Sequence, residues 1–339
     1  MNKIETRHRR RVLLMGLALI ACIFGSFTMG RYPVSLSELL GVLGYKLGLP
    51  IAPFWTGSVE AAVWNIRLPR VILSVLVGAC LAAAGGAYQG VFQNPMASPD
   101  ILGASAGAGF GAALAILLGA SSMGITIGAF AASLLTVALV FTVSRHAKGD
   151  RVLGLVLAGI MISSLFQSGT SFLKLVADPN NQLPQITYWL MGSLSGAKWS
   201  DIGFVLIPML CGLVPLYLLR WRLNVITMGD DEARAMGVDP RKIRLWISVA
   251  STLVTASAVS VSGMIGWVGL VIPHIMRRLV GSDYRFLMPG SMLGGGIFLL
   301  IVDNVSRNAA GIPIGILTAF IGAPFFLWLI TGKGDHYAH

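Results

Sequence analysis

Long apolar runs constrain this chain more than any other feature of its sequence. Stretches of about 20 residues with few charges follow one another, and a helix needs about that many apolar residues to cross a bilayer. Of the 339 residues, 55% are hydrophobic and 12% are charged. The sequence therefore predicts an all-α, polytopic membrane protein in which residues 1–339 form a single transmembrane domain.

About ten transmembrane helices are expected, with both termini in the cytoplasm. The expected spans are 12–29, 68–90, 101–119, 125–144, 152–176, 202–219, 243–261, 268–280, 286–305 and 314–330. Short external helices are expected at 38–47, where Ser35 or Ser37 caps the first turn, and at 185–191. Residues 1–11 are expected to form a basic cytoplasmic N-terminus, and residues 221–242 a charged cytoplasmic segment.

The net charge of +11 invites comparison with nucleic-acid-binding proteins. Most of the Lys and Arg residues, however, fall in segments expected inside the cell, including Lys148 and Lys333. That distribution is the positive-inside bias of membrane proteins, so no nucleic acid partner is expected. The three cysteines lie in apolar runs without metal-ligand spacing, and are expected as buried small side chains rather than as a disulfide or zinc site: Cys22, Cys80 and Cys211.

The most charged internal stretch, Met228–Lys242, is built as two helix starts in a row. Asp230 and Asp231 can cap a first helix that Gly237 ends, and Asp239-Pro240 then opens a second one. A helix this short is marginal on its own. It is either an ordinary loop that rests on its own protein or a docking element for another protein.

Chemistry within the membrane has little support in this sequence. Acidic residues lie in the aqueous or boundary segments, apart from Asp303. His274 has no metal-ligating partner at helical spacing, and the chain has no phosphate-binding Gly-x4-Gly-Lys-Ser/Thr motif. We therefore expect no cofactor, no metal site and no enzyme activity, and we expect transport to be driven by an external motor.

Three arginines are expected on the outer side, where they break the positive-inside bias: Arg67, Arg70 and Arg307. They are either membrane anchors or sites that receive the carboxylates of a soluble partner. Glycines recur every fourth residue at two places, which is typical of helices that pack closely in membranes: Gly103, Gly107 and Gly111, and Gly86 and Gly90.

Two long motifs, Asn94–Gly103 and Gly266–His274, resemble signatures of the permeases that import iron–siderophores, haem and vitamin B12. Further matches occur in the family's order along the chain: Arg67–Arg70, Leu157–Gly159, Trp189–Ser193, Asp303 with Arg307, Pro313–Gly315 and Gly322–Phe326. The resemblance implies ten helices per subunit in the bacterial cytoplasmic membrane. It also implies a second permease subunit, identical or different, two ATPase subunits below and a substrate-binding protein outside.

The resemblance assigns three groups of residues. The expected coupling helix, which docks on the ATPase, comprises Met228, Gly229, Asp230, Asp231, Glu232, Ala233, Arg234, Ala235, Met236 and Gly237. The arginines expected to meet the binding protein are Arg67, Arg70 and Arg307, and the expected cytoplasmic gate is Asn94, Pro95 and Met96. The chain departs from the family at Gly311, where a Glu is usual.

The expected function is that of a membrane permease in an ATP-driven importer for a metal chelate, with a ferric siderophore as cargo. A haem or cobalamin permease is the alternative within the family. A secondary, ion-coupled transporter and a structural membrane subunit are the alternatives outside it.

Overall fold

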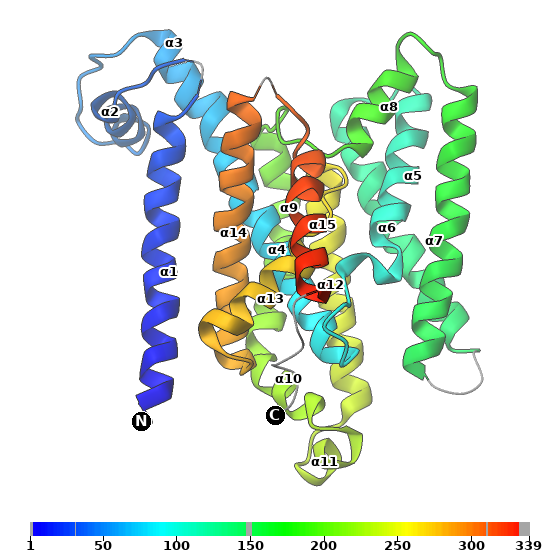
Figure 1. The fold of residues 1–339 in the computed structure, drawn as a ribbon. Helices are drawn as coiled ribbons and strands as arrows, with labels where there is room; N and C mark the ends of the chain where they lie inside the picture. The colour runs from blue at the N-terminus through cyan, green and yellow to red at the C-terminus, as the bar shows by residue number, and fades with distance from the viewer. Residues whose placement is uncertain (1–2, 31, 147–150, 310, 332–339) are drawn as a thin grey trace.

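The computed structural model describes residues 3–30, 32–146, 151–309 and 311–331, and the regular structure in these ranges is helical (Figure 1). Lys148, Lys333 and residues 1–2 of the expected N-terminal segment lie outside them. In chain order the helices are α1 (Lys3–Thr28), α2 (Leu36–Lys46), α3 (Gly57–Glu60), η1 (Ala61–Arg67), α4 (Leu68–Val91), η2 (Pro99–Leu102), α5 (Ala104–Leu117), α6 (Ser122–Ser144), α7 (Arg151–Val176), α8 (Gln182–Leu190), α9 (Trp199–Leu218), α10 (Arg220–Thr227), α11 (Asp230–Ala235), α12 (Pro240–Ser262), α13 (Val268–Val280), α14 (Tyr284–Asn308) and α15 (Ile314–Thr331).

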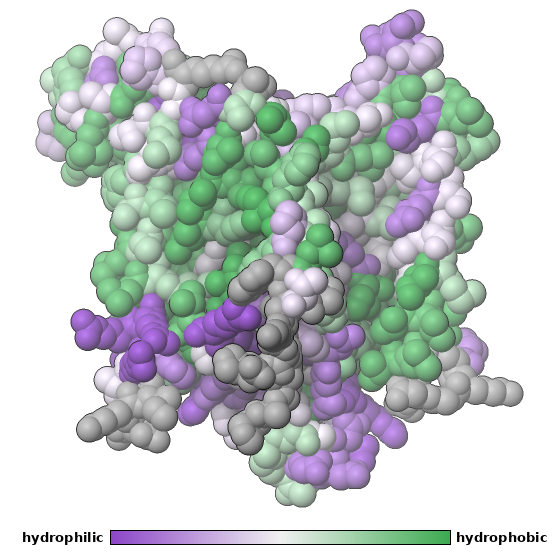
Figure 2. All heavy atoms as spheres, in the orientation of Figure 1, coloured by the Kyte–Doolittle hydropathy of each residue, from purple (hydrophilic) through white to green (hydrophobic). Residues whose placement is uncertain are grey.

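Seven helices in the described residues are long and apolar enough to cross a membrane. They are Glu5–Thr28, Gly57–Val91, Ser122–Ser144, Val152–Val176, Trp199–Leu218, Pro240–Ser262 and Tyr284–Asn308. Shorter apolar helices occur in α5 and α15. Figure 2 shows hydrophobic residues across the middle of the face in view, with hydrophilic residues gathered over the end that carries α10 and α11. The all-α, polytopic fold is confirmed, whereas the count of ten spans and the cytoplasmic termini stay predictions.

Local sequence signals place several helix ends correctly. α13 has the expected bounds, and Ser35 caps α2 as expected. The Ser35 Oγ accepts a hydrogen bond from the Glu38 N–H at 3.2 Å, and the Glu38 carboxylate accepts one from the Ser35 N–H at 2.9 Å. This reciprocal pair is a capping box. The helix expected at 185–191 is found as α8, which begins three residues earlier.

The second span does not begin at residue 68 as expected. α3, η1 and α4 follow one another without a break, so the helix runs from Gly57 to Val91. η1 is a π-helical turn, in which the N–H of Leu68 bonds to the carbonyl of Val63. The wider turn leaves room for the ring of Pro69, which has no N–H to donate and disrupts a regular α-helix. Arg67 and Arg70 therefore lie within a continuous helix rather than at its start.

The third span also begins later than expected, at Ala104 rather than at residue 101. Pro99 starts a short 3₁₀ turn, and Gly103 then adopts a φ of +76°. This left-handed conformation is one that glycine reaches without steric cost, so it turns the chain into α5. The packing role expected for neighbouring glycines is confirmed at Gly107, where an added Cβ would lie 2.0 Å from the Thr136 Oγ1 on α6.

α4 is the central helix of the bundle and is surrounded by α12, α13 and α14 (Figure 1). In its most apolar window, 78% of the residues are buried, compared with 11% in both α1 and α7. α1 and α7 thus lie at the periphery. They are free to face lipid or another subunit.

Glycines let α4 touch its neighbours backbone to backbone. A Cβ added at Gly85 would lie 1.8 Å from the carbonyl oxygen of Gly269 on α13, and one at Gly78 would lie 2.2 Å from that of Gly295 on α14. Gly86 belongs to a pair of glycines four residues apart, yet a Cβ added there would meet nothing closer than 3.6 Å. The spacing therefore identified the right helix but not the positions of closest approach.

The cysteines differ from one another in their surroundings. Cys80 is fully buried on α4 as expected, and Cys22 is half-buried on α1. Cys211 is exposed on α9, so its expected burial is wrong. A hydropathy pattern identifies an apolar helix but does not tell its lipid-facing side from its buried side.

The packing of α4 on α13 yields a matched pair of variants. We expect Gly85→Ala to destabilise the protein by about 1–3 kcal/mol, because its methyl group cannot fit against the Gly269 carbonyl. Gly86→Ala, one residue along the same helix, should change stability little. Thermal unfolding of the purified variants in detergent measures the difference. Equal melting temperatures would show that α4 and α13 separate without cost.

Candidate functional site

The charged segment forms a compact projection at one end of the bundle, where α11 lies beyond the other helices (Figure 1). The expected capping by Asp230 or Asp231 is wrong, because the N-cap of α11 is Gly229 with a φ of +129° and no side chain caps the helix. Asp230 is instead held by Arg244 of α12, with O–N distances of 2.6 and 3.0 Å. This ion pair fixes α11 against the start of α12.

The end of α11 and the start of α12 follow the sequence prediction. Gly237 has a φ of +76°, and its N–H donates to the carbonyl of Arg234 at 2.9 Å. The N–H of Val238 donates to the carbonyl of Ala233 at 2.9 Å, which completes a Schellman motif. The Asp239 side chain accepts from the next two free N–H groups and so caps α12.

The two faces of this projection differ. Ala233 is fully buried against the protein, whereas Met228 and Met236 expose 63% and 45% of their surfaces. Methionine side chains are flexible and polarisable, and they occur often at binding surfaces. The segment rests on its own protein through one face and exposes the two methionines among charged side chains, including Asp231 and Arg234.

The expected gate residues form a tight turn between α4 and η2. The Asn94 side-chain oxygen accepts from the Met96 N–H at 2.8 Å, and the Asn94 carbonyl accepts from the Ala97 N–H at 3.0 Å. Met96 is 45% exposed. The turn that the sequence predicts is present, and its role as a gate stays a prediction.

A residue that the sequence analysis missed joins this turn to the charged segment. Gln93 has a φ of +49°, in the left-handed region, and its side-chain Nε2 donates to the carbonyl of Ile226 at 3.0 Å. Ile226 lies in the last turn of α10, immediately before α11. Two stretches far apart in the sequence are thus hydrogen-bonded where α4 ends.

α10 is also fastened to the start of α14. The Asn224 side chain donates to the Asp283 carboxylate at 2.6 Å and accepts from the Tyr284 N–H at 2.8 Å. Partial burial alone would raise the pKa of Asp283, but hydrogen bonds from Arg285 and Asn224 outweigh it and lower the pKa. Asp283 therefore stays ionised at neutral pH and holds this corner together.

At the opposite end of the bundle, Asp303 of α14 binds two of the three outer arginines. Its carboxylate is fully buried and receives the Arg70 Nε at 2.9 and 3.1 Å and an Arg70 Nη at 2.9 Å. The Arg307 Nε lies 3.4 Å from the same carboxylate. The sequence did not reveal the contact with Arg70, because the two partners lie on different helices.

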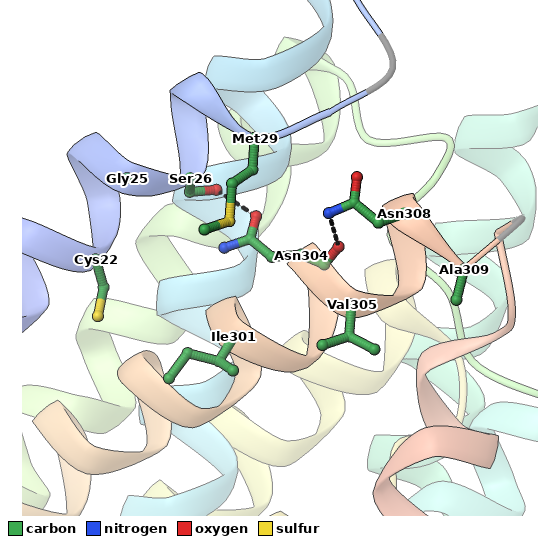
Figure 3. Close-up of a pocket in the computed structure, with 9 residues that line it drawn as sticks. All are labelled: Cys22, Gly25, Ser26, Met29, Ile301, Asn304, Val305, Asn308 and Ala309. Carbon is green, nitrogen blue, oxygen red and sulfur yellow. Dashed lines mark hydrogen bonds between the residues drawn. The ribbon is translucent and has the colours of Figure 1, made fainter.

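Arg307 is further held by α1. Its Nη2 donates to the Ser26 Oγ at 2.6 Å and to the Asn304 side chain. Figure 3 shows Ser26 and Asn304 facing each other across the groove between α1 and α14, with a hydrogen bond of 2.8 Å between them. Arg67 is buried, and its guanidinium donates to the carbonyls of Phe27 and Tyr32.

The outer arginines therefore do not reach outward as free membrane anchors. Arg70 and Arg307 share one carboxylate, and Arg67 is neutralised by no acid among the described residues. The cluster keeps an excess of positive charge at the mouth of the bundle. Gly311, which departs from the family pattern, lies nearby in the loop after α14 with a φ of +78°. Glycine adopts that φ readily, whereas a glutamate there would be strained.

One face of α7 carries exposed polar side chains at helical spacing. These residues are Ser164, Gln167, Ser168 and Ser171. The serine hydroxyls bond back to carbonyls of their own helix at 2.9–3.0 Å, but the Gln167 amide has no hydrogen-bond partner among the described residues. An unpaired amide is costly in lipid. This face fits a water-filled path or another subunit better than a bilayer.

The FecCD transport family matches residues 18–332. The molybdate import system permease protein of Haemophilus influenzae is 39% identical over 319 residues, covering 93% of this chain and 94% of that protein. The hemin transport system permease protein of Yersinia pestis is 38% identical over 340 residues, covering 95% of this chain and 96% of that protein.

Comparison of the fold with solved structures agrees with the sequence comparisons. A solved structure of a metal-chelate type ABC transporter in an inward-facing conformation matches with a TM-score of 0.84 and 36% identity, over 95% of this chain and 99% of that chain. The family resemblance read from the motifs is confirmed. This chain belongs to the FecCD transport family and is a multi-pass ABC importer permease of the cytoplasmic membrane.

Proposed function

We propose that this permease carries an intact metal chelate, first of all a ferric siderophore, along a path lined by the polar face of α7. The observation that carries the proposal is the exposed stripe of Ser164, Gln167, Ser168 and Ser171. Hydroxyl and amide groups bind the polar exterior of a chelate weakly at several points, and weak, repeated binding favours passage over capture. Figure 2 shows hydrophilic residues among the hydrophobic ones in the region of α7.

The same face needs a second permease subunit, identical or different, to close the path. Polar backbone and side chains at membrane depth persist where protein or water covers them. In the most apolar window of α7, 11% of the residues are buried, so most of the helix surface is left for another subunit to cover. A pair of subunits with their α7 stripes facing inward encloses a polar route through the bilayer.

The motor is proposed to act through Met228–Gly237. Two ATPase subunits dock on the exposed methionines, and nucleotide binding moves α11. The movement passes through Ile226 and Gln93, which are joined by a hydrogen bond of 3.0 Å, to the turn at Asn94, Pro95 and Met96. The two permease subunits then rock between outward- and inward-open states.

A substrate-binding protein is proposed to dock outside on Arg67, Arg70 and Arg307. The cluster contains three guanidinium groups and one carboxylate, a net charge of +2, so two further carboxylates from a partner would complete its charge balance. Because Asp303 already orients Arg70 and Arg307, less side-chain freedom is lost on docking.

The cargo is tested by uptake into vesicles that contain the permease with its co-purifying ATPase and binding protein. We expect ATP-dependent uptake of a ⁵⁵Fe-labelled ferric siderophore in preference to hemin, cobalamin and molybdate. Gln167→Leu should reduce uptake several-fold, whereas Ile207→Leu on the exposed face of α9 should not. Preference for another cargo would correct the chelate class. Uptake driven by an ion gradient without ATP would overturn the importer mechanism in favour of a secondary transporter.

The docking face of α11 is tested by Met236→Asp. An aspartate there removes an apolar contact and places an unpaired charge in the interface, so we expect association with the ATPase to weaken by about 30-fold or more. Leu47→Asp, at an equally apolar exposed site on the opposite end, is the control. Co-purification and binding assays measure the effect. Unchanged association of Met236→Asp would show that α11 is an ordinary loop.

The outer docking site is tested by Arg307→Gln. Asp303 keeps its three short contacts with Arg70, so we expect the variant to fold while docking of the binding protein weakens about tenfold at low salt. The difference should shrink at high salt, because ions screen the interaction. Lys46→Gln removes a cation from the same end as a control. Docking as tight as that of the wild type would assign Arg307 a structural role alone.

A further inference from the structure

In addition to the groove between α1 and α14, a pocket lies at the α11 end of the bundle, away from the polar face of α7. It has a volume of about 510 Å³ and opens between the end of α4, the end of α6 and the first turns of α7 and α12. Its lining residues are Val91, Phe92, Phe141, Ser144, Arg145, Val152, Leu155, Arg241, Arg244, Leu245 and Ser248. None of the functions discussed above uses this pocket.

The pocket is strongly basic. Arg145, Arg241 and Arg244 line it, and no acidic side chain does so among the residues that the structure describes. Arg244 is paired with Asp230, but its Nε is buried and has no hydrogen-bond partner among the described residues. The guanidinium groups of Arg145 and Arg241 also have no hydrogen-bond acceptor in the described part of the chain. The pocket therefore holds donor capacity and positive charge that its own residues do not satisfy.

The remaining walls are mostly apolar, apart from Ser144 and Ser248, and lie at the ends of apolar helices long enough to cross a membrane. Val91 and Phe92 end α4, and Phe141 lies in the last turn of α6. Leu155 and Leu245 contribute from the first turns of α7 and α12. The pocket thus combines a cationic rim with an apolar interior, which is the polarity of a lipid with a charged headgroup.

We propose that this pocket binds a phosphate-type anion, supplied by the headgroup of an anionic phospholipid of the cytoplasmic leaflet. Arginine binds phosphate oxygens through two parallel N–H groups, and basic pockets between transmembrane helices favour such headgroups. An acyl chain lies against the apolar wall while the phosphate meets the arginines. Free phosphate shares the headgroup chemistry but gains nothing from that wall.

The position of Arg244 gives the proposed site a structural consequence. Arg244 lines the pocket and also holds Asp230 of α11. A bound phosphate would satisfy the unpartnered Nε and so reinforce the support of the coupling helix. The proposal does not depend on which cargo the permease carries.

Lipid retention by the full-length permease, measured by native mass spectrometry, tests the proposal. The protein is purified in mild detergent and titrated with phosphatidylglycerol or phosphatidylcholine. Each arginine near a headgroup contributes a roughly 5-fold effect, so Arg145→Gln with Arg241→Gln should weaken phosphatidylglycerol binding about 30-fold. Arg9→Gln with Arg10→Gln removes the same charge from exposed positions on α1 and should have little effect. Phosphatidylcholine binding should change little in either variant.

Three outcomes would overturn the proposal. The first is equal phosphatidylglycerol binding by the wild type and the Arg145/Arg241 variant, or an equal loss in the α1 control. The second is displacement of the lipid by inorganic phosphate at comparable concentration, which would make the anion a soluble one. The third is loss of ATPase association without any change in lipid retention, which would assign the arginines to a protein partner. Thermal unfolding of each variant confirms that the comparison is made on folded protein.

Discussion

The direct backbone contact of α4 with α13 and α14 is the constraint on which the rest of this structure depends. Gly85 lies against Gly269 and Gly78 against Gly295, so the three helices cannot shift relative to one another without breaking contact. α4 has 24 residues and is therefore about 36 Å long, which is enough to cross the hydrocarbon core. It carries Arg70 near one end and leads directly into the turn at Met96 at the other. Part of the outer arginine cluster and the candidate gate turn are thus attached to a single helix.

Buried charge supplies the second constraint, at the outer end. Burying the Asp303 carboxylate costs free energy. That cost is offset because Arg70 makes three contacts with the carboxylate, and Arg307, which lies on α14 like Asp303, approaches it as well. Such a cluster adds less to stability than an apolar core of equal volume would. Its contribution is orientation, since it fixes the rotation of α4 relative to α14 and of both relative to Ser26 on α1.

Hydropathy and local capping signals predicted most of the helices, because these depend on residues close together in the sequence. α13 and the Asp239-Pro240 start of α12 are examples. The contacts that build the candidate sites could not be predicted in this way. Arg70 and Asp303 are 233 residues apart, and Gln93 and Ile226 are 133 apart. The N-cap predicted for α11 was wrong for a related reason. Asp230 fits the local capping rule, but its carboxylate binds Arg244 instead, and Gly229 is the N-cap residue.

The π turn at Ala61–Arg67 affects the direction in which α3, Trp55 and α2 extend from the bundle. Each residue of a regular helix advances the chain by about 100° around the axis. Removing one residue from this turn would restore α geometry and swing α3, Trp55 and α2 around the axis by about that angle. The glycine contacts of α4 further along would stay in register. The orientation of α2 and α3 thus depends on the residue count of one turn as well as on the packing of Leu39 and Val42 with Val71 and Leu300 in one buried cluster.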